Sequence, residues 1–147
     1  MILLHILCSC LSYAAFLVAC VAGALFLVQE RQLKRKTLGV LFHRLPPLES
    51  LDRLNFAAIG TGFALLTLGL ACGMTETRMM LGRWWTQDPK AYGALGLWGA
   101  YCLLWLVRLR ATLRGHRVAL LSLLGFTLVL LTVVTTTRLL HSLHPFV

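Results

Sequence analysis

GRWWTQDPK, residues 82–90, is a short polar stretch between two apolar segments of this chain. It holds two of the four tryptophans, Trp84 and Trp85. Two adjacent indoles on a short loop offer a flat apolar surface with polar edges, which suits the interface between a membrane and water. The stretch therefore predicts a loop at a membrane surface, with a membrane-spanning helix on either side.

The composition of the whole chain supports a membrane protein. Of its 147 residues, 59% are hydrophobic and 13% are charged, and the mean hydropathy is +0.80. Soluble domains average about 45–50% apolar and about 25% charged residues. The net charge of +9 does not indicate a nucleic-acid partner, because the bases are grouped at the ends of apolar runs, where they orient helices in the bilayer.

The five cysteines all lie in apolar runs, and none forms a Cys-x-x-Cys pair. We interpret them as small buried residues and not as a disulfide or metal set. Because Cys-x-x-Cys-His is absent from the sequence, the chain is not itself a c-type cytochrome.

Four apolar stretches are long enough, or nearly so, to cross the hydrocarbon core, which takes about 20 helical residues. They cover about 2–28, 54–74, 92–107 and 118–137. The sequence predicts an all-α polytopic membrane protein, with one four-helix transmembrane domain over residues 1–147 and an outer loop over 75–91. The third stretch is short and carries Gly93, Gly96 and Gly99, so we expect it to pack against a protein neighbour.

The basic residues predict the orientation of the helices. The loops after the first and third stretches carry ten bases: Arg31, Lys34, Arg35, Lys36, Arg44, Arg53, Arg108, Arg110, Arg114 and Arg117. The opposite side carries four: Arg78, Arg83, Lys90 and Arg138. The positive-inside rule places the ten in the cytoplasm and both termini and the tryptophan loop outside. This predicts a multi-pass protein of the bacterial inner membrane.

The first cytoplasmic loop has two further features. Pro46-Pro47 forces an extended piece, after which Ser50 or Asp52 is expected to cap the second helix. The basic run Arg31–Lys36 is interpreted as a topology signal, with contact to anionic lipid as the alternative.

This topology brings several polar groups to the outer face: His5, Trp84, Trp85, Asp88, His141 and His144. Two imidazoles that approach from opposite sides are a common way to hold haem iron. His5 and His144 come from opposite ends of the chain, with His141 as the alternative to His144. Arg83, Lys90 or Arg138 would meet the haem propionates. The alternative is that these are ordinary interfacial histidines and an aromatic belt. His43 and His116 lie among cytoplasmic bases and are interpreted as solvated or in contact with lipid.

The sequence also resembles a known family. GRWWTQDPK is similar to the tryptophan-rich WWD signature of the cytochrome c assembly family, which handles haem and includes CcsA- and HemX-like groups. The resemblance continues in the same order along HILCSCLSYAAFLVACVAGALFLVQERQLKRK, LPPLESLDRLNFAAIGTGFALLTLGL and LLGFTLVLLTVVTTTRLLHSLHPF. It covers nearly the whole chain. Family members commonly have about eight spans, and this chain resembles the last four.

The resemblance implies that haem is held on the outer membrane face between two histidines that flank the tryptophan loop. These carry over onto His5 and His144. The loop signature carries over onto Gly82, Trp85, Asp88, Pro89 and Lys90, with Trp84 on an aromatic position. The chain departs from the family at Leu81 and Gln87, where tryptophan is frequent, and at Ala91, where glutamate is frequent.

The function predicted on these grounds is binding and presentation of haem b in cytochrome c biogenesis, with His5 and His144 as iron ligands and Trp84 and Trp85 as the platform. Asp88 is expected to order the loop and to cap the third helix. No catalytic residue is assigned, so an enzymatic role is expected only as part of a haem-attachment system. The expected partners are other membrane subunits, apocytochrome c and the bilayer. The alternatives are an accessory subunit of a respiratory or photosynthetic membrane complex, without or with haem, and an electron-transfer haem subunit.

Overall fold

The computed structural model describes residues 2–36, 46–84, 89–109 and 115–143, the last eight of these and residues 89–90 by their backbone alone. The described part of the chain forms four helices: α1 (Ile2–Arg35), α3 (Leu48–Leu81), α4 (Pro89–Leu109) and α5 (His116–Leu143). Each is long and apolar enough to cross a membrane. The prediction of an all-α chain with four candidate membrane spans is confirmed for these residues.

Three of the helices continue well beyond the apolar stretches. α5 ends at Leu143, six residues after its stretch, and α3 ends at Leu81, inside the predicted outer loop 75–91. α1 runs through a polar tail to Arg35, where Lys34 Nζ lies 2.8 Å from Glu30 Oε1. α3 begins six residues before the apolar run, and Arg53 pairs with Glu49 over 3.1 Å there. Ion pairs four residues apart and strong helix formers such as Gln, Lys and Arg favour helical backbone outside the apolar region.

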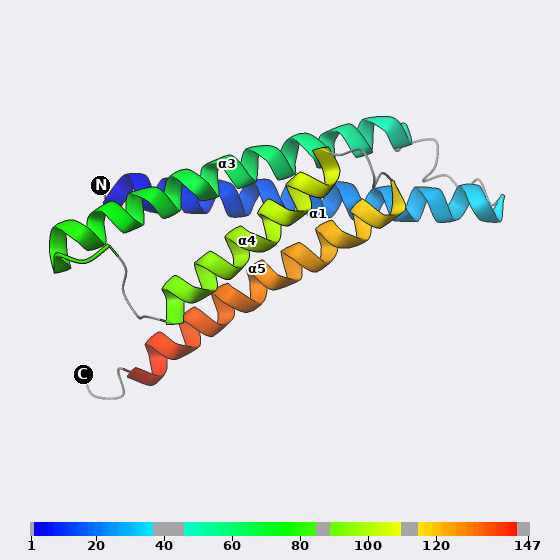
Figure 1. Cartoon of the computed structure of the whole chain (residues 1–147). Coiled ribbons are helices and arrows are strands. Elements are labelled where there is room, and N and C mark those ends of the chain that lie inside the picture. Colours follow the sequence, from blue (N-terminus) through cyan, green and yellow to red (C-terminus); the bar gives the residue numbers. More distant parts are fainter. Residues whose placement is uncertain (1, 37–45, 85–88, 110–114, 144–147) are drawn as a thin grey trace.

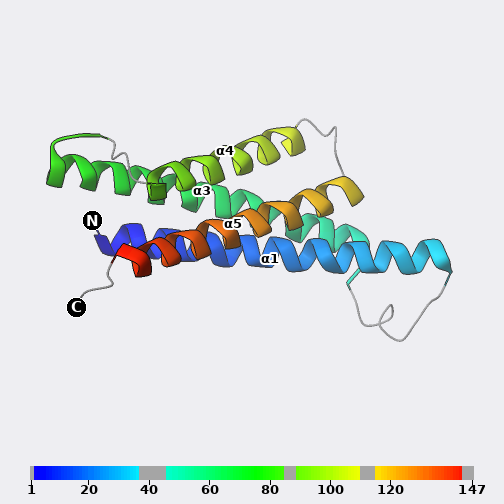
Figure 2. The same cartoon turned by 90° about the horizontal axis from the view of Figure 1, so that it is seen from below.

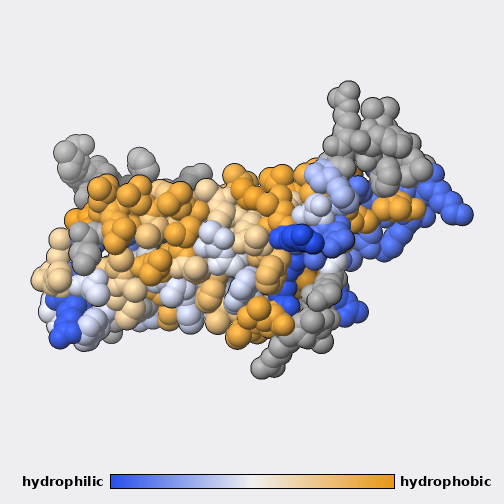
Figure 3. Space-filling view, turned by 90° about the horizontal axis from the view of Figure 1, so that it is seen from above, coloured by the Kyte–Doolittle hydropathy of each residue, from blue (hydrophilic) through white to orange (hydrophobic). Residues whose placement is uncertain are grey.

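The helices alternate in direction, so their ends gather in two groups. Figures 1 and 2 show the N-terminus, the end of α3, the start of α4 and the end of α5 at one end of the bundle, which we name the loop end. The opposite end, which we name the basic end, holds the end of α1, the start of α3, the end of α4 and the start of α5. In Figure 3 hydrophobic residues dominate the middle of the visible face, and hydrophilic residues gather towards its extremities. This distribution is what a bundle that crosses a bilayer requires.

α1 and α3 approach each other closely along a row of small residues. An added Cβ at Gly69 would lie 3.1 Å from Ser9 Oγ, and one at Gly73 would lie 3.1 Å from His5 Cε1. One at Gly62 would clash with the ring of Phe16. These glycines are seven and four residues apart, so they share one face of α3. Small residues at such spacing let two helix backbones pack closely in a membrane.

The centre of the bundle is a stacked aromatic pair. Phe16 of α1 and Tyr101 of α4 are fully buried, with ring centroids 3.6 Å apart and an interplanar angle of 17°. Gly62 makes room for Phe16, and Gly125 of α5 makes room for Tyr101. All four helices therefore contribute to this contact, which fixes their mutual positions at mid-height.

Nearer the basic end, a polar group joins the same four helices. Asn55 Nδ2 donates to Ala19 O over 2.7 Å and to Ser122 Oγ over 2.9 Å, while its Oδ1 accepts from Arg108 Nη1 over 2.8 Å. Arg108 Nη2 also donates to the backbone and the carboxylate oxygens of Asp52, over 2.7 and 2.9 Å. We name these residues the Asn55 cluster. Each buried polar group in it has a partner, which such groups need in an apolar setting.

The expectation that Ser50 or Asp52 caps the second helix is wrong. α3 begins at Leu48 after Pro47, with no side-chain cap. The amides of Ser50 and Leu51 donate instead to the Pro47 carbonyl, over 2.9 and 3.2 Å. Pro47 is extended, with φ −55° and ψ 148°, so the chain enters the helix directly from the proline pair. Asp52 lies inside the helix and binds Arg108.

The glycines of α4 meet a neighbour within this chain at one position of three. A Cβ at Gly93 would lie 3.1 Å from Thr132 Cγ2 of α5, whereas Cβ atoms at Gly96 and Gly99 would have nothing within 4 Å. An apolar groove of about 370 Å³ also runs between α4 and α5, lined by Tyr101, Leu104, Leu124 and Gly125 among others. The expected close packing of this helix is thus met within the described bundle at Gly93 and not at Gly96 and Gly99.

The cysteines are all free thiols. Cys8 is buried, Cys20, Cys72 and Cys102 are partly buried, and Cys10 is exposed on the outside of α1. The interpretation of burial therefore holds for Cys8 and is wrong for Cys10. A small thiol tolerates a surface that faces lipid, because it behaves as a weakly polar apolar group.

Candidate functional site

The candidate site is built on the end of α3. Leu81 is the last helical residue, and Gly82 adopts the left-handed conformation with φ 65° and ψ 7°. Its amide donates to the Arg78 carbonyl over 3.0 Å, which closes the helix. Glycine is the residue that best accepts this conformation, since it has no Cβ to clash with the following carbonyl. Gly82 thus turns the chain back toward α3.

The turn places Trp84 against the side chain of Arg78. The guanidinium carbon of Arg78 lies 3.9 Å from the Trp84 ring centroid, which is a close cation–π contact. Trp84 is 53% exposed, so the structure leaves much of the indole open. Arg78 therefore occupies part of the platform predicted from the sequence.

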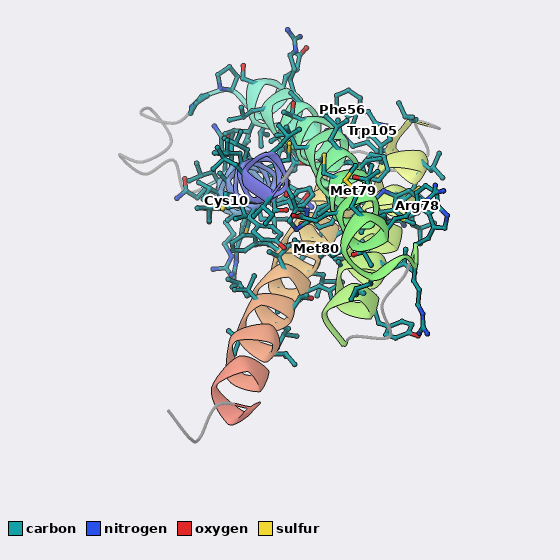
Figure 4. All side chains as sticks on the ribbon, turned by 90° about the vertical axis from the view of Figure 1, so that its left-hand side faces the viewer. Cys10, Phe56, Arg78, Met79, Met80 and Trp105 are labelled. Carbon is teal, nitrogen blue, oxygen red and sulfur yellow. The ribbon has the colours of Figure 1, made fainter. Side chains whose placement is uncertain are left out.

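The last turn of α3 before this indole carries three exposed apolar side chains that the sequence reading missed. Met79, Met80 and Leu81 are exposed by 75%, 69% and 61%. Figure 4, which looks onto the loop end, shows Arg78, Met79 and Met80 on the last turns of α3. Figure 1 shows this part of α3 extending past the N-terminal end of α1. The signal available in the sequence was the pair of methionines directly before the tryptophan stretch.

His5 is held against α3 by its ring nitrogen. Its Nδ1 lies 2.6 Å from the Gly69 carbonyl oxygen, so Nδ1 carries the proton and donates. The edge of the ring lies against Gly73, which has no side chain to displace it. Within the described part of the chain, Nε2 makes no hydrogen bond, and in this tautomer of the neutral ring it bears a lone pair. This arrangement suits a histidine that binds a metal through Nε2.

His5 and Trp84 are at the same end of the bundle but are not in contact. Gly73 marks the level of His5 on α3, and nine residues separate it from Gly82, which corresponds to about 13 Å along a helix axis. Arg83 is exposed next to Trp84. The structure therefore brings Trp84 together with Arg78 and brings His5 together with Gly69 and Gly73.

The other predicted site residues fall outside what can be described. Trp85, Asp88 and His144 lie in the segments 85–88 and 144–147. Lys90, Arg138 and His141 lie on α4 and α5, where the description covers their backbone only. Their assignments stay predictions. Among the residues that are described, no group of three or more His, Cys, Asp or Glu side chains is placed to hold a metal ion.

At the basic end, the side chain of His116, interpreted from the sequence as solvated or in contact with lipid, is about half exposed and also has a partner. Its Nδ1 lies 2.7 Å from Glu30 Oε2, and so α5 is tied to the tail of α1. The pKa of Glu30, two residues beyond the last apolar residue of the first stretch, is lowered mainly by the hydrogen bond from Lys34 and further by His116. His43 lies outside the described residues.

Comparison with known proteins identifies the family to which the chain belongs. Residues 1–144 match the model of the family described as cytochrome C assembly protein. The chain belongs to the cytochrome c assembly family. The match covers all four helices, from His5 through the tryptophan stretch to His144.

Individual relatives in this family carry the name cytochrome c biogenesis protein CcsA. That of Prochlorococcus marinus (strain MIT 9215) is 30% identical over 99% of this chain and 53% of its own length. That of Guillardia theta is 28% identical over 99% of this chain and 53% of its own length. That of Porphyra purpurea is 33% identical over 70% of this chain and 32% of its own length. No solved structure matches the chain.

The chain spans about half the length of the first two of these relatives. Membership of the cytochrome c assembly family, with four helices that can span a membrane, supports a multi-pass membrane protein.

Proposed function

We propose that this chain holds haem b at the outer membrane face during cytochrome c assembly, with His5 and His144 as the two ligands of the iron. The observation that carries the proposal is the hydrogen bond of His5 Nδ1 to the Gly69 carbonyl. A backbone acceptor at Nδ1 fixes the tautomer in which Nε2 offers its lone pair, and this is the usual arrangement of metal-binding histidines.

The second ligand would come from the end of α5, which lies at the loop end with the start of α1. His144 follows directly after α5, and His141 is on the last turn of that helix. Since one imidazole comes from each end of the chain, the two can approach a flat ligand from opposite sides. His144 is the proposed ligand, and His141 is the alternative that a matched variant tests.

The surroundings of the site suit a porphyrin, which is a flat apolar ring with two carboxylates. Trp84 and the exposed methionines of α3 provide an apolar and polarisable surface, and Trp85 would extend it. Arg83 and Lys90 would bind the propionates by charge-assisted hydrogen bonds. Asp88 would order the loop and cap α4, which begins one residue later at Pro89.

The chemical role that follows is presentation of the haem and not catalysis by a side chain. Haem supplies the vinyl groups that react with the cysteine thiols of apocytochrome c when thioether bonds form. The contribution of this chain would be to bind the ring, to orient it and to keep it at the membrane surface, which lowers the entropic cost of the reaction. We therefore assign no general base or nucleophile.

The orientation of the bundle is part of the proposal. Among the described residues, seven Lys or Arg side chains lie at the basic end: Arg31, Lys34, Arg35, Lys36, Arg53, Arg108 and Arg117. Arg78 and Arg83 are the two at the loop end whose side chains are described, and Lys90 and Arg138 are described there by their backbone alone. The positive-inside rule favours the basic end in the cytoplasm, so the loop end would face outward from the bacterial inner membrane.

A visible absorption spectrum of the purified chain tests this function. We expect a reduced-minus-oxidised haem band that is lost in both His5→Ala and His144→Ala and retained in His141→Ala. The matched control at the other end is His116→Ala, which removes an imidazole from the same chain but should leave the band intact. A preparation reconstituted with haem that gives the same spectrum in all five proteins would exclude ligation by these histidines.

A second candidate function is an accessory subunit of a larger membrane complex, with or without haem. The open faces of Gly96 and Gly99 and the apolar groove between α4 and α5 favour it, because a further helix could pack closely there. Absence of haem together with co-purification of a stable larger assembly would support this role. Haem with a reversible potential and rapid reduction by quinol would instead indicate an electron-transfer subunit.

A further inference from the structure

A cavity at the basic end has no part in the proposed haem site. Its volume is about 480 Å³, and it lies between the last turns of α1 and the first turn of α5. Its lining consists of Leu27, Glu30, Arg31, Lys34, Arg35 and His116. Leu27 is next to the end of the apolar run, and the other five residues are polar, so the cavity lies where the bilayer meets water.

The single carboxylate in this lining is already fully engaged. Glu30 Oε1 accepts from Lys34 Nζ over 2.8 Å, and Glu30 Oε2 accepts from His116 Nδ1 over 2.7 Å. These bonds hold the lysine and the imidazole at the cavity wall. In the described part of the chain, no carboxylate pairs with Arg31 or Arg35. Three permanent cations thus face one anion, which leaves a surplus of two positive charges with the histidine neutral.

The start of α5 adds donors on the opposite wall. α5 begins at His116 and has no acidic residue in its first turn. The preceding Gly115, with φ 67°, has no side chain that could cap the helix. Within residues 115–143, the first backbone amide that bonds back is that of Ala119, which donates to the Gly115 carbonyl over 3.0 Å. The earlier amides carry the positive end of the helix dipole toward this region.

Phosphate is the ligand whose chemistry matches this combination. Guanidinium groups bind its oxygens in pairs, and helix amides favour an anion. Arg31 and Arg35 are one turn apart on α1, so both can reach one phosphate. Leu27 is the apolar residue of the lining, and its neighbour in the chain, Val28, is 42% exposed at the end of the apolar run. An apolar surface next to the cations favours a phosphate that carries acyl chains.

We infer that the cavity between the tail of α1 and the start of α5 binds the phosphate of an anionic phospholipid, with Arg31 and Arg35 as its main ligands. Glu30 is a positioning residue that holds Lys34 and His116 beside the headgroup. The basic run Arg31–Lys36 has two possible roles that can be told apart. As a topology signal it needs only positive charge on this side of the membrane. As a lipid site it needs Arg31 and Arg35 in particular.

Native mass spectrometry of the full chain in detergent tests the site. The chain is titrated with phosphatidylglycerol and, separately, with phosphatidylcholine. We expect selective retention of phosphatidylglycerol, reduced about fivefold in each of Arg31→Ala and Arg35→Ala. Arg53→Ala is the matched control, because it removes one exposed guanidinium at the same end outside the cavity. It should change retention by less than about twofold.

Three outcomes would overturn the inference. Equal retention of the two lipids would exclude a site for anionic headgroups. An equal loss in Arg53→Ala and Arg31→Ala would indicate general charge attraction without a defined site. Displacement of the lipid by millimolar inorganic phosphate, with no preference for the lipid, would assign the cavity to soluble phosphates. Circular dichroism of each variant shows whether the helices are intact, and Arg31→Lys, which keeps the charge, should retain part of the binding.

Discussion

Arg108 Nη1 and Asn55 Oδ1 are joined by a hydrogen bond of 2.8 Å between two side chains that are both buried. The buried guanidinium of Arg108 depends on acceptors from the protein, because water is excluded from around it. Asn55 Oδ1 is one of these acceptors. Its Nδ2 also donates to Ala19 O of α1 and to Ser122 Oγ of α5. A single residue of α3 thus contacts the three other helices.

Replacement of Arg108 by alanine should destabilise the bundle strongly. Asn55 Oδ1 would lose the donor Arg108 in a buried position, which costs about 1–3 kcal/mol. The partly exposed Asp52 carboxylate would also lose its partner. Unfolding of the detergent-solubilised chain, followed by helical circular dichroism against denaturant, measures the effect. Arg53→Ala is the control, since that exposed pair should contribute about 0–1 kcal/mol. Similar losses in the two variants would contradict the role of the Asn55 cluster.

A bulkier residue at position 73 should weaken haem binding without removing His5. In Gly73→Val the new side chain begins 3.1 Å from His5 Cε1, so the ring must turn away from the Gly69 carbonyl. Loss of an orienting partner typically lowers metal affinity by about 10–100-fold. Haem titration followed in the Soret region measures the change.

Gly96→Val is the matched control for that experiment. The same side chain is added to a helix, but a Cβ at Gly96 has nothing within 4 Å in the described structure. Haem affinity should therefore stay as in the unchanged chain. Equal weakening in both variants would point to a general disturbance of the helices and not to His5.

Truncation of Trp84 should lower the affinity for haem by a modest factor. An aromatic contact contributes about 0.5–1.5 kcal/mol beyond the area it buries, so Trp84→Ala should lower haem affinity about two- to tenfold. Trp98→Phe serves for comparison, because that indole bonds to Thr67 over 3.0 Å on an exposed side of α3 and α4, away from the turn at Gly82. An unchanged affinity in Trp84→Ala would remove this ring from the site.

Alanine at Gly82 should lower the stability of the chain, whereas alanine in place of a glycine inside a helix should raise it. Gly82→Ala forces a Cβ into a left-handed residue, which costs about 1–2 kcal/mol although the surrounding space is open. Gly96→Ala, within α4, should instead stabilise by up to about 1 kcal/mol. Amide hydrogen exchange over the last turns of α3 reports the first change, and global unfolding reports the second.

The tie between α1 and α5 should depend on pH through Glu30. Because its pKa lies below the ordinary value of 4.5, the folded chain favours the ionised carboxylate. The stabilisation is therefore complete above the ordinary value and is lost as the pH falls through the lowered one. Melting temperatures of the natural chain and Glu30→Gln should differ at neutral pH and converge as the pH falls below the ordinary value of 4.5 and through the lowered pKa. A constant difference across this range would contradict the assignment.

The sequence predicted the helical spans because uninterrupted apolar runs leave few other structures in a membrane. It did not predict the contacts between the spans. Asn55 and Arg108 are 53 residues apart, and the only local signal was one amide inside an apolar run. Arg108 was counted as a topology charge, although its side chain turns inward to Asp52.

For the same reason, some residues of the candidate site could be predicted from the sequence and others could not. His5 and the tryptophans stood out as rare residue types in an apolar chain. The partners that position them did not, since Gly69 acts through a backbone carbonyl and Gly73 through the lack of a side chain. Arg78 was grouped with the tryptophan loop, as the structure has it, but its contact with Trp84 depends on the left-handed turn at Gly82.

α3 is one continuous helix from the polar cluster to the tryptophan turn, with neither a proline nor a break between Asn55 and Leu81. It packs against α1 along most of this length, from Gly62 beside Phe16 to Gly73 beside His5. α3 is therefore a rigid spacer of roughly 39 Å between the Asn55 cluster and the turn. Its length sets how far the turn at Gly82 stands from the polar cluster, so inserting or deleting a residue between them would change both the height and the direction of the tryptophan turn.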